Sequence, residues 1–154
     1  MSERDSLRMG ELLVREGILT ANQVDEILIE QFNSEKPFGV IACEKFGIDE
    51  EDIWEAYACQ MVLFYDSVDL ACEVFDIGVT DTMTAREAWM QRILPMRFDG
   101  QEYVCATTRE QLPKAMAFVN ERFDHYVHFA LAERGQLEVF IMQQYAEAGQ
   151  ALEI

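Results

Sequence analysis

The two histidines come first as candidates for chemistry, because imidazole binds metals and transfers protons near neutral pH. His125 and His128 lie three residues apart in the segment DHYVH. The apolar residues that follow predict a β-strand, and a spacing of three in a strand places two side chains on opposite faces. The pair therefore does not predict a joint metal site, and ordinary surface or half-buried histidines are the simpler interpretation.

The cysteines and one acidic run are the next candidates for metal binding. Cys43, Cys59, Cys72 and Cys105 have no CxxC spacing and sit in apolar contexts, which favours buried, reduced thiols. The acidic run from Asp49 to Asp52 precedes a predicted helix, where acids stabilise the positive N-terminus. Consecutive residues cannot all face one ion, so helix capping explains the run better than a metal site does.

Composition narrows the classes of function. The sequence has no GxSxG, no HExxH and no phosphate-cradling GxxxxGK motif, so we expect no enzyme. Its 29 acidic and 12 basic residues give a net charge of -17. Such a surface repels DNA, RNA and anionic lipid and favours a basic protein partner. No secretory signal and no apolar run of about 20 residues is present, so we expect a cytoplasmic protein without membrane insertion.

An internal repeat with an offset of 29 residues organises the first part of the chain. The segment 8–31 is an amphipathic helix-turn-helix unit, and the same layout returns at 37–60. Gly17 is expected to end the first helix at positive φ, and Thr20 with Gln23 predicts a capping box at the next. That next helix should bury Val24, Ile27, Leu28 and Phe32. The paired positions are Gly10 with Gly39, Leu12 with Ile41, Leu19 with Ile48, Val24 with Ile53, Leu28 with Tyr57 and Gln31 with Gln60.

After residue 61 the pattern changes to mixed helices and strands. The expected elements are a buried extended segment at Val62–Asp66, a helix at 80–92, a hairpin of strands 93–98 and 102–106, a helix at 109–123, a strand at 126–131 and a helix at 133–147. The predicted fold class is α+β. A four-helix tandem helix-turn-helix repeat (1–61) precedes a small αββαβα half with a three-stranded sheet (62–154), and the two are expected to pack as one unit.

The repeat resembles the N-terminal domain of the ATPases that power type II secretion and type IV pilus assembly (the GspE N-terminal or MshEN type). Two tandem motifs mark that domain, and the first is matched here at Arg8, Met9, Gly10, Leu13, Val14, Gly17, Ile18, Leu19, Val24, Leu28 and Gln31. The similarity continues through Val62–Asp66 and the hairpin to Gln143-Gln144-Tyr145, which covers residues 7–145. The ATPase domain that normally follows is missing from the sequence.

The resemblance implies a ligand site, because some members bind cyclic di-GMP through the two motifs. In the first motif, Arg8 would supply a cation, and Gly10 and Gly17 would let the backbone approach the ligand. The second motif departs from the pattern, since Pro37 replaces the Arg or Asn and Phe46 replaces the second Gly. The candidate site residues are Arg8, Met9, Gly10, Val14, Gly17, Leu28, Gln31, Phe38, Gly39, Tyr57 and Gln60.

Three interpretations of the repeat follow. The resemblance implies a non-catalytic interaction or regulatory module that docks onto a cytoplasmic part of the membrane platform of a secretion or pilus machine. A cyclic di-GMP sensor is the alternative. Packing alone also accounts for the pattern, because apolar residues at helical spacing are usually core and glycines after helices are usually caps. Neither the partner nor the oligomeric state follows from the sequence.

Overall fold

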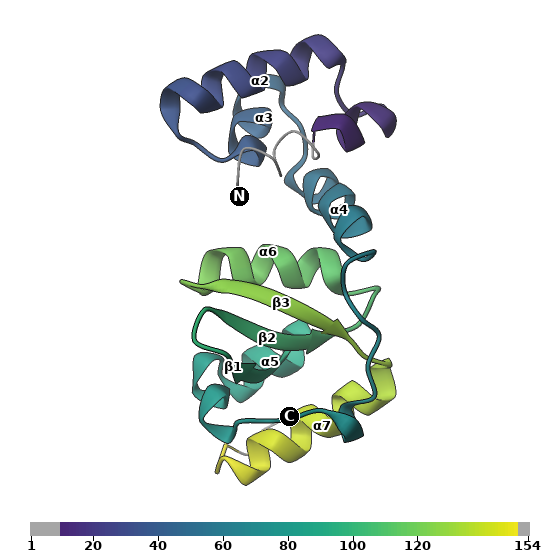
Figure 1. Cartoon of the computed structure of the whole chain (residues 1–154), viewed down its shortest axis with the longest axis vertical. Helices are drawn as coiled ribbons and strands as arrows, with labels where there is room; N and C mark the ends of the chain where they lie inside the picture. Colours follow the sequence, from purple (N-terminus) through teal and green to yellow (C-terminus); the bar gives the residue numbers. More distant parts are fainter. Residues whose placement is uncertain (1–9, 151–154) are drawn as a thin grey trace. The chain divides into compact units, whose positions relative to one another are not determined.

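The computed structural model describes residues 10–150, and the chain divides into two compact units, Met1–Met61 and Val62–Ile154. We call these the helical unit and the sheet unit (Figure 1). The predicted α+β class is confirmed, with a helical repeat followed by helices around a mixed sheet of three strands.

The helical unit is built from two helix-turn-helix copies. A first helix includes residues 10–15 and is followed by α2 (Ala21–Ser34), α3 (Phe38–Phe46) and α4 (Glu50–Met61). The predicted capping box starts α2, with Thr20 Oγ1 accepting from Gln23 N at 3.2 Å and the Gln23 side chain accepting from Thr20 N at 2.9 Å. Gly17 has a φ of 75°, as expected for a residue that ends a helix.

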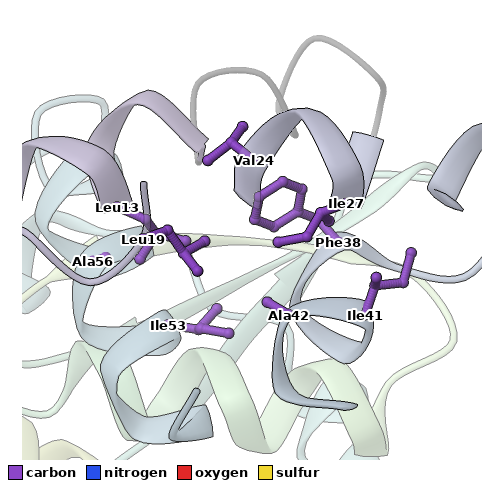
Figure 2. Packing of buried hydrophobic residues seen from close by; sticks show 9 residues of the cluster. All are labelled: Leu13, Leu19, Val24, Ile27, Phe38, Ile41, Ala42, Ile53 and Ala56. Carbon is purple, nitrogen blue, oxygen red and sulfur yellow. The ribbon is translucent and has the colours of Figure 1, made fainter. Parts of the chain in front are cut away.

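Both copies contribute to one apolar core. Each helix presents only one apolar stripe, so a single copy cannot enclose a core, and the two copies bury their stripes against each other. Figure 2 shows the buried side chains that come together from all four helical segments and the turn after the first: Leu13, Leu19, Val24, Ile27, Phe38, Ile41, Ala42, Ile53 and Ala56.

One expected core residue of α2 is not buried. Phe32 is 85% exposed, whereas Val24 and Ile27 are buried and Leu28 is half-buried. The prediction was wrong because successive residues turn by about 100° around a helix, which places residue 32 about 90° from the centre of the buried stripe. Gln31 is nearer that centre and is half-buried.

The sheet unit holds three strands in the order β1-β2-β3. The strands are β1 (Leu94–Phe98), β2 (Glu102–Thr107) and β3 (Tyr126–Leu131). The predicted hairpin joins β1 and β2, and its turn is stabilised by Asp99 Oδ1, which accepts from Gln101 N at 3.0 Å and Glu102 N at 2.9 Å. Strands β2 and β3 are parallel and are connected through α6 (Leu112–Arg122). Their carboxyl ends therefore meet at one edge of the sheet.

Helices cover the sheet from two sides. In Figure 1, α6 lies beside β3, and α7 (Arg134–Glu147) lies on the other side of the three strands. The short helix α5 (Ala85–Gln91) packs against α7. The fully buried Tyr145 of α7 donates a hydrogen bond from its hydroxyl to the carbonyl oxygen of Met83 at 3.1 Å.

The segment Val62–Asp66 does not form the expected buried extended element. Val62, Leu63 and Phe64 form a turn, and the side chains of Leu63 and Phe64 are 82% and 57% exposed. Only Tyr65 is buried. The chain first meets the sheet at its end, where Asp66 O accepts from Leu131 N at 2.9 Å. An apolar run without a strand partner has no reason to stay extended.

The helix expected at 80–92 is divided. A 3-10 helix, η2 (Ile77–Thr82), ends before Thr84, and Thr84 then caps α5. Thr84 Oγ1 accepts from Glu87 N, and the Glu87 carboxylate accepts from Thr84 N, both at 3.0 Å. The capping box therefore moves the start of the helix to Ala85. A second 3-10 helix, η1 (Leu70–Cys72), precedes this region.

Candidate functional site

The candidate ligand residues are carried by the helical unit. Arg8 and Met9 lie outside the described residues. Gly10 and Val14 belong to the first helix, Leu28 and Gln31 to α2, Phe38 and Gly39 to α3, and Tyr57 and Gln60 to α4, while Gly17 ends the first helix.

Two residues of the first motif lie open to solvent. Gly17 N donates to Val14 O at 3.0 Å and Ile18 N to Leu13 O at 2.9 Å, the bond pair of a glycine-terminated helix. A Cβ placed on Gly17 would meet no atom within 4 Å, and Val14 is 38% exposed. This end of the first helix therefore offers bare backbone and an apolar side chain to a ligand.

Gly10 serves packing. It is buried, and a Cβ at this position would lie 2.5 Å from Val24 Cγ1. The absence of a side chain lets the first helix approach α2 closely. A ligand is thus not needed to explain this glycine.

The second motif offers less to a ligand. Phe38 is fully buried in the core and presents no ring to solvent. Gly39 is half-buried, and a Cβ there would lie 3.4 Å from Ile53 Cγ2. Tyr57 is half-buried and meets Trp54 edge to face, with ring centroids 6.0 Å apart. Of these candidate residues, only Gly39 and Tyr57 are partly accessible.

The glutamines that close the two motifs are the polar candidates. Gln31 and Gln60 are both half-buried. Gln60 Oε1 is buried and accepts no hydrogen bond from the part of the chain between residues 10 and 150. An unpaired buried amide oxygen is unfavourable by about 1–3 kcal/mol, so this atom would gain from a donor.

The lysines near the second motif do not replace its missing cation. Lys36 Nζ lies 3.3 Å from Glu44 Oε2, and Lys45 Nζ lies 3.6 Å from Glu30 Oε2. Both lysines are already paired with acids, so their charge is partly compensated before a phosphate could bind. Pro37, where the family motif has Arg or Asn, is exposed and uncharged.

The histidines belong to separate aromatic clusters. His125 precedes β3 and meets Phe98 and Tyr103 edge-on, with ring centroids 5.1 and 5.8 Å away. His128 lies in β3 and meets Tyr65 at 5.1 Å. Among the described residues, no group of three or more His, Cys, Asp or Glu side chains is arranged to hold a metal ion.

The cysteines are less buried than expected. Cys105 is fully buried in β2, and burial raises the pKa of its thiol. Cys43 is half-buried, and burial together with the nearby Glu50 raises its thiol pKa. Cys59 and Cys72 are exposed, which corrects the expectation of four buried thiols. An apolar sequence context did not distinguish the buried face of a helix from its edge.

The sequence missed one feature. A cavity of about 890 Å³ lies in the sheet unit, and none of the candidate ligand residues lines it. Its basic lining residues come from positions 92, 109, 114 and 134, which have no common motif. Only the parallel pairing of β2 with β3 brings the segments that follow these strands together.

Comparison with known proteins identifies the fold. No protein-family model and no curated protein matches the chain. Among solved structures, the chain is similar to that of MshE with cyclic di-GMP, with 25% identity and a TM-score of 0.50. The match covers 89% of this chain and 98% of that chain. Within residues 10–150, no helix has the length and apolarity needed to cross a membrane. The chain is thus an MshEN-like domain, of the type found at the N-terminus of type II secretion and type IV pilus ATPases.

Proposed function

We propose that the chain is a non-catalytic interaction and regulatory module that docks onto a cytoplasmic component of a secretion or pilus machine. The observation that carries this proposal is the outer face of α2. Ile29 and Phe32 are 65% and 85% exposed and lie one helical turn apart. Covering two large apolar side chains removes area from water that contributes about 25 cal/mol per Å². A partner protein would supply that cover.

The charges around this face indicate the chemistry of the partner. Asp25 and Glu26 are exposed on the preceding turn of α2, and the whole chain carries a charge of -17. A matching surface would combine an apolar groove with a basic rim, because opposite potentials speed association and exclude wrong partners.

Titration against the cytoplasmic domain of a platform protein tests the docking proposal. The double variant Ile29→Ser/Phe32→Ser should weaken binding at least tenfold, which corresponds to about 1.4 kcal/mol. Both side chains are exposed, so the fold should be retained. The matched control is Val74→Ser in the sheet unit, which removes a side chain that is 70% exposed and should leave affinity unchanged. No binding of the wild-type chain at high micromolar concentration would contradict the proposal.

A cyclic di-GMP sensor is the second candidate. It is supported by the similarity to MshE solved with this ligand, by the open end of the first helix at Gly17 and by the unpaired Gln60 Oε1. The burial of Phe38 and the uncharged Pro37 count against a complete second half-site. A ligand held mainly by the first motif is consistent with both sets of observations.

Calorimetry with cyclic di-GMP tests this candidate. Saturable heat is expected, and Arg8→Ala should weaken binding by about 1.5–3 kcal/mol, the range for a hydrogen bond to a charged group. Arg15→Ala is the matched control, because Arg15 is an exposed cation on the same stretch that lies off the motif. The absence of heat from folded protein would reject the sensor while leaving the docking proposal intact.

A further inference from the structure

The cavity of the sheet unit lies where the two parallel strands end. Its wall includes Thr108, which follows β2, and Ala132, which follows β3. Met90 and Arg92, at the end of α5, contribute another part. Small molecules commonly bind outside the carboxyl ends of parallel strands, where loops diverge. Its volume of about 890 Å³ falls within the usual range of about 300–1,000 Å³ for such sites.

Positive charge is concentrated in this cavity. Four of the 12 basic residues line it, namely Arg92, Arg109, Lys114 and Arg134, although acids outnumber bases 29 to 12 in the chain. The acidic lining residues are Glu110 and Glu133. A cavity that gathers cations in an acidic protein attracts anions locally, because charges beyond about 10 Å are screened by salt.

Glu133, one of the two acidic residues that line the cavity, caps the N-terminus of α7. Its carboxylate accepts from Gly135 N at 3.0 Å and Gln136 N at 3.1 Å, which caps α7. These backbone hydrogen bonds lower the pKa of Glu133. Its negative charge therefore faces the helix N-terminus and compensates less of the cavity's positive charge.

Two of the cations are free to meet a ligand. Neither Arg109 nor Lys114 forms an ion pair with any residue between Gly10 and Gln150, and both are exposed. Their side chains retain all their donors for an external anion.

Arg92 lies in the wall of the cavity and has an unfavourable backbone conformation. Its φ of 53° lies in the left-handed region, which is unfavourable for a residue with a Cβ. The guanidinium carbon lies 4.0 Å from the centroid of the Trp89 ring, and Nε lies 3.7 Å from Glu138 Oε1. Thr107 Oγ1 donates to its carbonyl oxygen at 2.9 Å. A fixed guanidinium thus borders the cavity where glycine would suit the backbone better.

We propose that this cavity binds a phosphate-bearing small molecule of nucleotide size. Arg109 and Lys114 would hold the phosphate, since guanidinium and ammonium groups form charge-assisted hydrogen bonds with its oxygens. Arg134 also lines the cavity, but its Nε is paired with Glu138 Oε1 at 2.9 Å. The cavity is larger than one phosphate ion requires, and Val68 and Met90 give it an apolar part. The proposal concerns the sheet unit alone and does not depend on the docking or cyclic di-GMP candidates.

Nuclear magnetic resonance titration of the full chain tests the proposal, with inorganic pyrophosphate and AMP as separate probes. Each probe should cause saturable shifts of the backbone amides of residues 108–112, 114 and 132–136, with a Kd at or below about 1 mM. Tighter binding of AMP than of pyrophosphate would show that the apolar wall takes part. The absence of saturable shifts in these residues with either probe would overturn the proposal.

Two double variants separate a specific site from a general effect of charge. Arg109→Gln/Lys114→Gln should weaken binding at least tenfold. Arg86→Gln/Arg122→Gln removes the same charge from the sheet unit outside the cavity and should change affinity less than twofold. Equal weakening by both would overturn the proposal. A hexaglutamate peptide that binds these residues more tightly than pyrophosphate would also overturn it, in favour of an acidic protein segment.

Discussion

Gly10 and Gly39 hold the same position in the two repeat copies, and each faces the same partner position on the following helix. A Cβ on Gly10 would lie 2.5 Å from Val24 Cγ1, and one on Gly39 would lie 3.4 Å from Ile53 Cγ2. Only at Gly10 does the close approach of two helices require a glycine, because 3.4 Å at Gly39 is an ordinary van der Waals contact. A glycine in a repeat motif is therefore weak support for ligand binding unless its surface is open, as it is at Gly17.

Alanine substitutions at the paired glycines should have opposite effects on stability. Gly10→Ala should lower the free energy of unfolding by about 1–3 kcal/mol, because Val24 is β-branched and cannot easily turn away. Gly39→Ala meets only ordinary contacts and should be neutral or stabilising by up to about 1 kcal/mol, since alanine favours helix. Urea unfolding measures both. Equal destabilisation would show that the close approach of the first helix to α2 is not as described.

A second prediction at this scale concerns Tyr145. Its hydroxyl donates to Met83 O in a fully buried setting, and burial raises its pKa. Tyr145→Phe should lower the free energy of unfolding by about 1–2 kcal/mol, because the carbonyl loses its donor. The control Tyr126→Phe removes a hydroxyl from a side chain that is 54% exposed, and it should change the free energy of unfolding by less than about 0.5 kcal/mol. Denaturant titration that finds no difference between the variants would contradict the expectation.

At the scale of elements, the sequence predicted correctly those features that depend on residues close together in the chain. The Thr20 capping box, the Asp99-Gly100 turn and the strand 126–131 follow from residues within a few positions of one another. The prediction of a single helix at 80–92 was wrong, although the sequence contains a local signal for where α5 begins. Thr84 followed by Glu87 is itself a capping box, and it would have placed the start of α5 correctly.

Other errors came from tertiary packing. The apolar run at Val62–Asp66 reads as a buried strand, yet Leu63 is 82% exposed, because a strand needs a partner that the sequence does not reveal. Tertiary packing limited the prediction of the candidate ligand site in the same way. An aromatic residue at the start of α3 suits a ligand platform or a core, and the structure shows that Phe38 is fully buried.

The cap of α5 also makes stability depend on pH. Hydrogen bonding from Thr84 N and the pairing with Arg122, whose Nε lies 3.3 Å away, lower the pKa of Glu87 from its usual 4.5. A lowered pKa in the folded state stabilises the fold above pH 4.5, and this contribution is lost as the pH falls through the lower folded value.

Substituting Glu87 by Gln keeps the capping geometry and removes the charge. Glu87→Gln should be less stable than the wild type by about 0.5–1 kcal/mol at pH 7, and the difference should shrink as the pH falls below 4.5. Urea unfolding at pH 7 and pH 3 measures this. The control is Glu121→Gln on α6, whose carboxylate has no hydrogen bond or ion pair with the described residues. If the difference in stability between Glu87→Gln and the wild type persists at pH 3, its cause is packing and not the charge.

At the scale of the whole molecule, two cores lie in two units. The helical unit is enclosed by its repeat helices, and the sheet unit by α6 and α7 around the three strands. A unit of about 60 residues buries a smaller fraction of its chain than one of about 90, so its net stability is lower. We therefore expect calorimetry of the full chain to show two thermal transitions, with the helical unit unfolding first.

Matched core substitutions can assign the two transitions. Ile41 is 1% exposed in the helical unit and Ile141 is 0% exposed in the sheet unit. Each change to Ala should remove about 2–5 kcal/mol from the unit that contains it. Ile41→Ala should lower only the first transition, and Ile141→Ala only the second. If one transition moved with both variants, the units would unfold as one cooperative body. A signal bound at one unit would then change the stability of the other, which independent units would not allow.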